Sequence, residues 1–130
     1  MGDTQDYIKE LTENYHKQII KEKYLVVTEL DYGIFQFTCW TKKWDMPIGM
    51  VWVRFGSNQE NETVGDILDC YTTQWARRNG ICRFLYTAIL ERVDILRTAN
   101  GSDEGGRIFL EKFGFKYSKE AGLWCYRKKS

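Results

Sequence analysis

The residues best suited to chemistry lie in one short segment, RRNGICR at positions 77–83. The segment joins a strand-like apolar run to the start of an amphipathic helical pattern. The start of a helix presents unpaired backbone N–H groups and the positive end of the helix dipole, so it attracts anions. Gly80 removes a side chain where a phosphate would approach, and three arginines add positive charge. The segment therefore suggests an anion site, although solvated loop arginines beside a turn glycine would produce the same pattern.

The first half of the chain predicts the elements that lead to this segment. Asp3 to Lys23 places its apolar residues on one helical face, and Asp3 or Thr4 can cap that helix. Four strand-like runs follow, at residues 24–30, 34–40, 47–55 and 64–72. Their short connections predict an antiparallel meander.

The second half predicts a crossover back to the sheet. Apolar residues recur at helical spacing from Ile81 to Ile89, and a strand over Asp94 to Ala99 would then lie parallel to the fourth strand. The polar residues 100–104 can cap a short helix that runs through Lys112, and Gly114 is placed to end it in a left-handed conformation. With a last strand at residues 123–128, the predicted layout is α-ββββ-α-β-α-β. We therefore predict an α/β fold with a mixed, mostly antiparallel sheet flanked by helices, in a single domain over residues 1–130.

Composition narrows the class of protein. The chain has 130 residues, a net charge of +1 and 15% aromatic residues, enough for one well-packed core. A balanced charge argues against a nucleic-acid-binding module that depends on a basic surface. No segment resembles a signal peptide or a membrane span, so we expect a cytoplasmic protein without a membrane partner.

The four cysteines do not suggest a metal site. Cys39, Cys70, Cys82 and Cys125 form no C-x-x-C pair, and His16 is the only histidine in the sequence. Zinc sites need clustered ligands, so we expect no metal. Three of the four lie in apolar runs, where a free cysteine usually packs as a small buried side chain.

Two motifs resemble those of the GNAT superfamily of N-acetyltransferases. The segment YTTQWARRNGIC is similar to the family's cofactor-loop motif, in which Arg or Gln is followed after two residues by Gly and, one residue later, by Gly or Ala. Arg77, Gly80 and Cys82 occupy those three positions. Downstream, FLEKFGF at positions 109–115 resembles the family's later motif, with the expected strand between the two. The resemblance covers about residues 64–126 and implies a GNAT-like fold.

The resemblance also implies a cofactor and a reaction. The end of the fourth strand, residues 69–73, would splay from the next strand and bond the acyl and pantetheine parts of acetyl-CoA. The loop would hold the pyrophosphate of coenzyme A, and a primary amine would attack the thioester directly from the opposite side. The implied cofactor-binding residues are Cys70, Tyr71, Thr72, Thr73, Arg77, Arg78, Asn79, Gly80, Ile81, Cys82 and Arg83.

A general base for the amine is implied on the fourth strand. Asp66 matches the position that one branch of the family uses, and Asp69 is the alternative on the same strand. Strict alternation of side chains would turn Asp69 to the opposite face from Asp66. His16, on the first helix, is a more remote candidate.

The chain departs from the family at several positions. The tyrosine that protonates the departing thiolate falls at Leu110, which cannot donate a proton. Cys82 replaces the second loop glycine, Asp103 stands where an asparagine often begins the last helix, and a tight hairpin replaces the usual amine-recognition helices. A proton donor would have to come from another tyrosine, for which the candidates are Tyr86, Tyr117 and Tyr126.

Two functions remain open from the sequence. The first is an N-acetyltransferase that acts on a primary amine of a small molecule or a protein, and edge strands would allow it to form a homodimer. The second is a GNAT-fold module that binds acyl-CoA without turnover and acts through a protein partner. Leu110 favours the second, and the loop favours neither.

Overall fold

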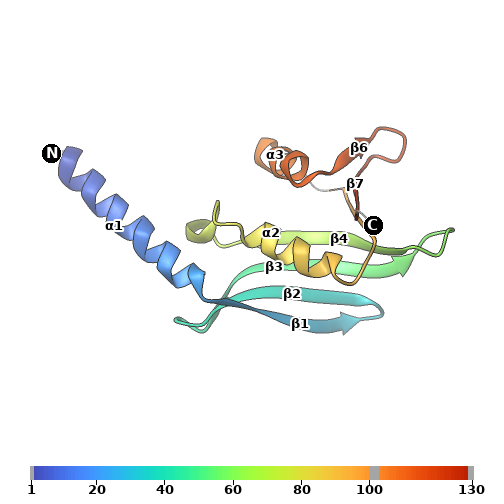
Figure 1. Cartoon of the computed structure of the whole chain (residues 1–130), viewed down its shortest axis with the longest axis horizontal. Helices are drawn as coiled ribbons and strands as arrows, with labels where there is room; N and C mark the ends of the chain where they lie inside the picture. Colours follow the sequence, from blue (N-terminus) through green and yellow to red (C-terminus); the bar gives the residue numbers. More distant parts are fainter. Residues whose placement is uncertain (1, 100–102, 129–130) are drawn as a thin grey trace.

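A computed structural model describes residues 2–99 and 103–128. Its centre is one seven-stranded sheet in the order β1-β2-β3-β4-β5-β7-β6 (Figure 1). The strands are β1 (Lys23–Asp31), β2 (Ile34–Thr41), β3 (Met46–Ser57), β4 (Thr63–Thr72), β5 (Ile95–Thr98), β6 (Lys116–Ser118) and β7 (Leu123–Arg127). The helices are α1 (Gly2–Lys21), α2 (Ile81–Leu90) and α3 (Glu104–Phe113), with a 3-10 turn, η1, at Gln74–Ala76. The predicted fold class and element order are confirmed, and β6 is an added strand that the sequence did not reveal.

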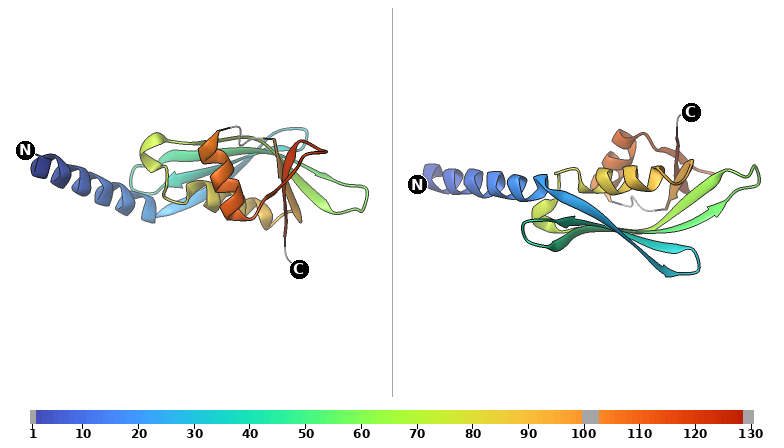
Figure 2. Two further views of the ribbon diagram at one scale, coloured as in Figure 1. Left: turned by 90° about the horizontal axis from the view of Figure 1, so that it is seen from above. Right: turned by 60° about the horizontal axis from the view of Figure 1, so that its bottom comes forward.

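Strands β1 to β4 form the predicted antiparallel meander. Their pairing turns alternate side chains toward α2, and Phe37, Val51 and Ile67 are buried on that face. Strand β5 then pairs parallel to β4, because α2 carries the chain back across the sheet. Helices α2 and α3 lie on the same side of the sheet (Figure 2).

Helix α2 packs unusually close to β3 at its first turn. A Cβ atom on Gly49 would lie 2.4 Å from the Ile81 Cγ2 methyl, a distance that no real contact tolerates. Ile81, Leu85 and Ile89 follow at helical spacing and are almost completely buried. A glycine in β3 therefore sets how near the start of α2 comes to the sheet.

Helix α3 begins and ends as the sequence predicted. Its N-cap is Asp103, whose carboxylate accepts a 2.6 Å hydrogen bond from the Gly106 N–H. Its C-cap is Gly114, with φ of 118°, and the Phe115 N–H donates to the Leu110 carbonyl oxygen in the hydrogen-bond pattern typical of such caps. Residues 100–102, which were other cap candidates, lie outside the described residues.

Helix α1 extends away from the sheet (Figures 1 and 2), and its buried side chains are at its C-terminal end. Ile19 and Ile20 enter the core, whereas the apolar side chains nearer the start of the helix, Tyr7, Ile8, Leu11 and Tyr15, are 43–62% exposed. The helix already includes Gly2, so the prediction that Asp3 or Thr4 caps it is wrong. None of the described helices is both long enough and apolar enough to cross a membrane.

Candidate functional site

Strand β4 has two halves with different neighbours. Residues 63–67, the paired half, lie between β3 and β5, and the β4–β5 pairing ends at Ile67 opposite Thr98. Residues 68–72, the open half, have no β5 partner among the described residues, and residues 69–72 of this half remain paired with β3. Backbone N–H and C=O groups on the β5 side of the open half therefore have no strand partner, and two backbone groups of this half bond side chains instead: the Cys70 N–H donates to the Asp69 carboxylate and the Thr72 carbonyl oxygen accepts from Arg77. The open half overlaps residues 69–73, the segment that the family resemblance expects to splay from the next strand.

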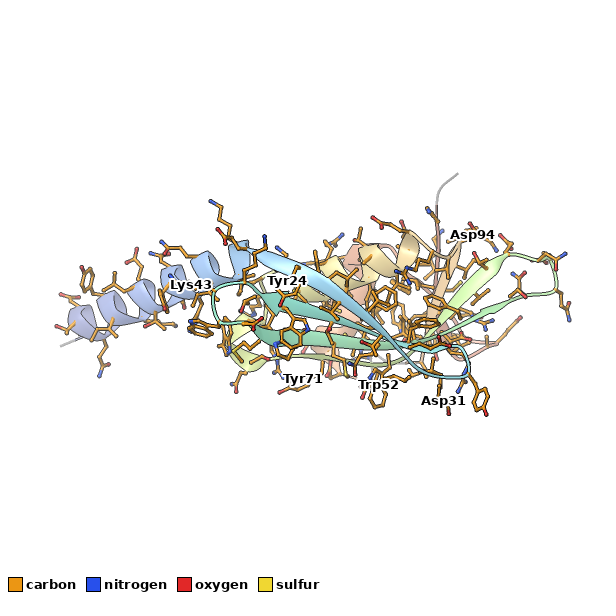
Figure 3. All side chains as sticks on the ribbon, turned by 90° about the horizontal axis from the view of Figure 1, so that it is seen from below. Tyr24, Asp31, Lys43, Trp52, Tyr71 and Asp94 are labelled. Atoms are coloured by element: carbon orange, nitrogen blue, oxygen red, sulfur yellow. The ribbon has the colours of Figure 1, made fainter. Side chains whose placement is uncertain are left out.

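A β-bulge marks the border between the halves. Val53 pairs with Ile67 but Trp52 pairs with Asp69, so Leu68 is an extra residue in β4. Asp66 and Asp69 therefore lie opposite Arg54 and Trp52, two residues apart on β3 and on the same face. The prediction from strict alternation that these two carboxylates face opposite sides is wrong. In Figure 3, Trp52 and Tyr71 lie on the side of the sheet away from α2.

The loop before α2 is held by its own polar groups. The Arg77 Nε atom donates to the Thr72 carbonyl oxygen at 3.1 Å, and the Asn79 amide donates to the carbonyl oxygens of Ala76 and Arg77. Arg78 adopts a φ of 66°, which costs a residue with a side chain about 1 kcal/mol or more. The hydrogen bonds of Arg77 and Asn79 therefore hold the loop in a conformation that Arg78 would not adopt by itself.

Gly80 is the N-cap of α2. Its φ is 76°, and a Cβ atom added there would meet nothing within 4 Å. It also provides no side-chain oxygen, so the N–H groups of Ile81, Cys82 and Arg83 have no intrahelical acceptor and no side-chain cap. The start of α2 therefore presents free donors beside open space, as a phosphate-binding helix start does.

A cavity of about 930 Å³ joins the open half of β4, the loop and α3. Nine of the predicted cofactor residues line it, and they are Cys70, Tyr71, Thr72, Arg77, Arg78, Gly80, Ile81, Cys82 and Arg83. The other two lie elsewhere. Thr73 donates its N–H to the Ile48 carbonyl oxygen, and Asn79 faces a neighbouring cavity of about 570 Å³ that shares Gly80 and Arg83.

The charged side chains around the larger cavity are mainly basic. Arg77, Arg78, Arg83 and Lys112 line it together with only two acids, Asp69 and Asp103. The Arg83 guanidinium also lies over the Phe113 ring, 4.9 Å from its centroid, which holds this cation against α3. An excess of cations near free N–H donors suits a ligand with several phosphates.

The two candidate bases have different surroundings. Arg97 lies opposite Asp66 in the β4–β5 register and binds both carboxylate oxygens, at 2.8 Å and 3.0 Å. The hydrogen bond to Asp66 raises the pKa of Arg97. Asp66 does not line the cavity, whereas Asp69 does and is exposed, with one oxygen accepting the Cys70 N–H at 2.9 Å. His16 packs on Trp75 at the base of α1 and does not line the cavity.

Two thiols and one phenol meet in the cavity wall. The Sγ atoms of Cys70 and Cys82 are 3.2 Å apart, and Tyr86 lines the same wall, near enough to have a lowering effect on the pKa of both thiols. Burial, together with negative charge on Cys70 when that thiol ionises, raises the pKa of Tyr86, so the phenol stays protonated. Of the three tyrosines that could replace the missing proton donor, only Tyr86 lines the cavity. Tyr117 stacks on Trp124, and Tyr126 packs on Phe113 and Phe115.

Helix α3 contributes wall residues that the sequence did not assign. Asp103, Gly106, Ile108 and Phe109 line the cavity, and the sequence had singled out only Asp103, at the start of the helix, and Phe109, in the later motif. Leu110 is also in the wall and is 3% exposed, so the position that carries a tyrosine in the family does face this site.

No protein-family model and no curated protein sequence matches the chain. Solved structures do match its fold. An acetyltransferase from Trypanosoma brucei superimposes with a TM-score of 0.62 at 16% identity, over 75% of this chain and 95% of that one. Arabidopsis thaliana NAA60, in complex with a bisubstrate analogue, gives 0.57 at 12% identity, over 75% and 76%. Arabidopsis thaliana Naa50, in complex with the bisubstrate analogue CoA-Ac-MVNAL, gives 0.57 at 15% identity, over 73% and 72%. The chain has the fold of the GNAT acetyltransferases.

Proposed function

We propose that this protein transfers the acetyl group of acetyl-CoA to a primary amine. The observation that carries the proposal is the meeting of the open half of β4 and the uncapped start of α2 in one basic cavity. Each feature alone has a structural explanation. Together they supply backbone donors and acceptors for an extended chain beside donors and cations for phosphates.

The residues of the cavity fit coenzyme A. Backbone groups of the open half would bond the pantetheine amides, and the N–H groups at positions 81–83 would bond the pyrophosphate. Arg77, Arg78 and Arg83 would balance its charge. A volume of about 930 Å³ is within the usual size of small-molecule sites. Bound acetyl-CoA supplies an activated acetyl group as its thioester.

We assign the base to Asp69 and not to Asp66. Asp69 is exposed on the open half, whereas both oxygens of Asp66 are bound by Arg97. Asp69 would accept the ammonium proton, directly or through water, as the amine nitrogen bonds to the acyl carbon and the carbon–sulfur bond breaks. Tyr86 would donate a hydrogen bond to the departing sulfur, because its hydroxyl is protonated and already lies beside two sulfur atoms.

A binding module without turnover is the second candidate. The observation that favours it is Leu110, which lies in the cavity wall and offers no proton.

If the protein is a transferase, the acceptor amine belongs to a small molecule or a protein partner. We further propose a cytoplasmic location, which four free cysteines in the described structure fit.

Binding is tested by thermal unfolding with and without acetyl-CoA. Wild type should melt at a higher temperature with acetyl-CoA, and Gly80→Glu should lose that shift because a carboxylate fills the phosphate position. Gly122→Glu is the matched control. Gly122 also has a left-handed φ, 66°, and empty space around it, but it lies outside the cavity. An equal shift in Gly80→Glu and Gly122→Glu would contradict the site.

Turnover is tested by measuring coenzyme A release with a panel of primary amines. Release that depends on the amine supports the transferase. A protein that binds acetyl-CoA and releases no coenzyme A with any amine would be the binding module, and Leu110→Tyr would then test whether the missing donor is the cause.

A further inference from the structure

The contact between Cys70 and Cys82 brings together two elements that hold the candidate cofactor. Cys70 is in the open half of β4, and Cys82 is in the first turn of α2. Their sulfur atoms are 3.2 Å apart, and both side chains are half-buried and line the larger cavity. A disulfide bond has an S–S length of about 2.05 Å, so the sulfurs need to approach by only about 1.1 Å. Neither the fold nor the proposed transfer reaction requires a thiol at either position.

The two thiols differ in reactivity. The hydrogen bond from Cys82 lowers the pKa of Cys70, while the same contact and burial raise the pKa of Cys82. The start of α2 adds a positive dipole beside the pair. Cys70 is therefore the more acidic of the two thiols, and Cys82 is the neighbouring thiol that can react with an oxidised Cys70.

The other two cysteines are poor competitors. Cys39 is completely buried, and burial raises its pKa to about 11. Cys125 is on β7 opposite Arg97, and it lines neither cavity. Of the four cysteines, only Cys70 and Cys82 both contact another cysteine and line a cavity.

We propose that Cys70 and Cys82 form a reversible disulfide in the wall of the cofactor cavity when the protein meets a peroxide. The Cys70 thiolate attacks one peroxide oxygen, the O–O bond breaks, and a sulfenic acid and water form after protonation. The Cys82 thiol then attacks the Cys70 sulfur and releases a second water. The two sulfurs lose two electrons, which reduce one peroxide to two waters, and a dithiol reverses the step.

The position of the pair couples this oxidation to the cofactor. Acetyl-CoA in the larger cavity would cover both sulfurs, so bound acetyl-CoA should slow oxidation. The disulfide would in turn pull the open half toward the N–H groups at positions 81–83, and acetyl-CoA should bind the oxidised protein more weakly. Couplings between sites are commonly about 5- to 150-fold, and we expect a weakening in that range. This coupling rests on the proposed function, whereas the disulfide does not.

Peptide mapping tests the disulfide without any assumption about function. The reduced protein, residues 1–130, is exposed to a series of hydrogen peroxide concentrations, free thiols are alkylated, and the protein is digested with trypsin. Trypsin cleaves after Arg54, Arg77, Arg78 and Arg83, so the two cysteines fall in separate peptides, 55–77 and 79–83. We expect these two peptides to become linked, with the link removed by dithiothreitol and Cys39 and Cys125 still alkylated.

Variants and ligand separate the outcomes. Cys125→Ser should form the linked peptides as wild type does, and Cys70→Ser and Cys82→Ser should not. Absence of the linked peptides in wild type, or an equal yield of pairs that involve Cys39 or Cys125, would overturn the disulfide. If acetyl-CoA raises the melting temperature yet neither slows the linkage nor binds more weakly to the oxidised protein, the coupling is wrong. If acetyl-CoA has no effect on melting while the linkage forms, the proposed function fails and the disulfide stands.

Discussion

The two halves of β4 are continuous in sequence but differ in what surrounds them. In the paired half, β5 covers one edge and Arg97 binds both oxygens of Asp66. In the open half, no described strand covers that edge, and Asp69 and Tyr71 line a cavity. The bulge at Leu68 separates the halves and leaves both aspartates on the same face. Two similar carboxylates, three residues apart, therefore have different neighbours.

This difference shows what determines whether a strand residue is available for chemistry. The residue type and the face are the same for Asp66 and Asp69, but the strand pairing is not. A carboxylate between paired strands can find a fixed partner, whereas one beside an unpaired edge meets solvent or ligand. We expect each half of β4 to respond differently to substitution, and the predictions below compare them.

The largest effect is expected from Asp69→Asn, measured as coenzyme A release with a reactive amine. Loss of a general base should lower kcat by about 10²–10⁴-fold near neutral pH. Part of the rate should return at high pH, where the amine loses its proton unaided. Asp66→Asn is the matched variant and should change kcat much less. A larger loss of kcat in Asp66→Asn than in Asp69→Asn would contradict this assignment and make Asp66 the base.

Next in size is the effect of one methyl group on β3. Gly49 pairs with Thr72 in the open half, and a Cβ there would meet Ile81 at 2.4 Å, whereas Gly56 pairs with Val64 in the paired half and has nothing within 4 Å. Gly49→Ala should lower the free energy of unfolding by about 1–3 kcal/mol through overpacking. Gly56→Ala should leave it nearly unchanged. Urea denaturation of both variants measures this, and equal midpoints would contradict the close approach of α2.

A somewhat smaller loss is expected at the end of α3, the helix that faces the open half. Gly114 has a left-handed φ of 118°, and a Cβ there would lie 3.0 Å from the Tyr126 ring. Gly114→Val should cost about 1 kcal/mol or more in unfolding free energy. Gly122→Val shares the left-handed φ without the contact, so it should cost less. If the two variants have the same melting temperature, the contact with Tyr126 adds nothing to the cost of the substitution.

The smallest effect concerns the ion pair of the paired half. The side chains of Asp66 and Arg97 are 37% and 40% exposed, so solvent screens their attraction. Asp66→Asn should lower the free energy of unfolding by about 1 kcal/mol or less, and high salt should reduce the difference from wild type. A loss of several kcal/mol in thermal or urea unfolding would show that this pair is a major support of the fold.

Local patterns predicted much of the fold and most of the candidate site. The helical spacing after Gly80 predicted α2, and the crossover rule made β5 parallel to β4. Gly80 and Gly114 both cap helices in a left-handed conformation. The sequence predicted this conformation for Gly114, from its place just after the last helical pattern. These features depend on residues close together in sequence, and so they leave a pattern that can be read from one chain.

Features that depend on distant residues could not be predicted. One inserted residue, Leu68, changed the face of Asp69, because strict alternation assumes a strand without bulges. The Asp66–Arg97 pair joins residues 31 positions apart, and the Cys70–Cys82 contact depends on how closely α2 packs on β4. The apolar face of α1 predicted a helix correctly but not that the helix would extend away from the sheet.

Hydrogen–deuterium exchange with and without saturating acetyl-CoA tests the central claim most directly. The claim is that the open half of β4 and the start of α2 bind the cofactor while the paired half does not. We predict that acetyl-CoA slows exchange in residues 68–72 and 81–83, and leaves residues 63–67 unchanged. Equal protection of both halves of β4, or no protection of residues 68–72 at a concentration that saturates binding, would contradict the account.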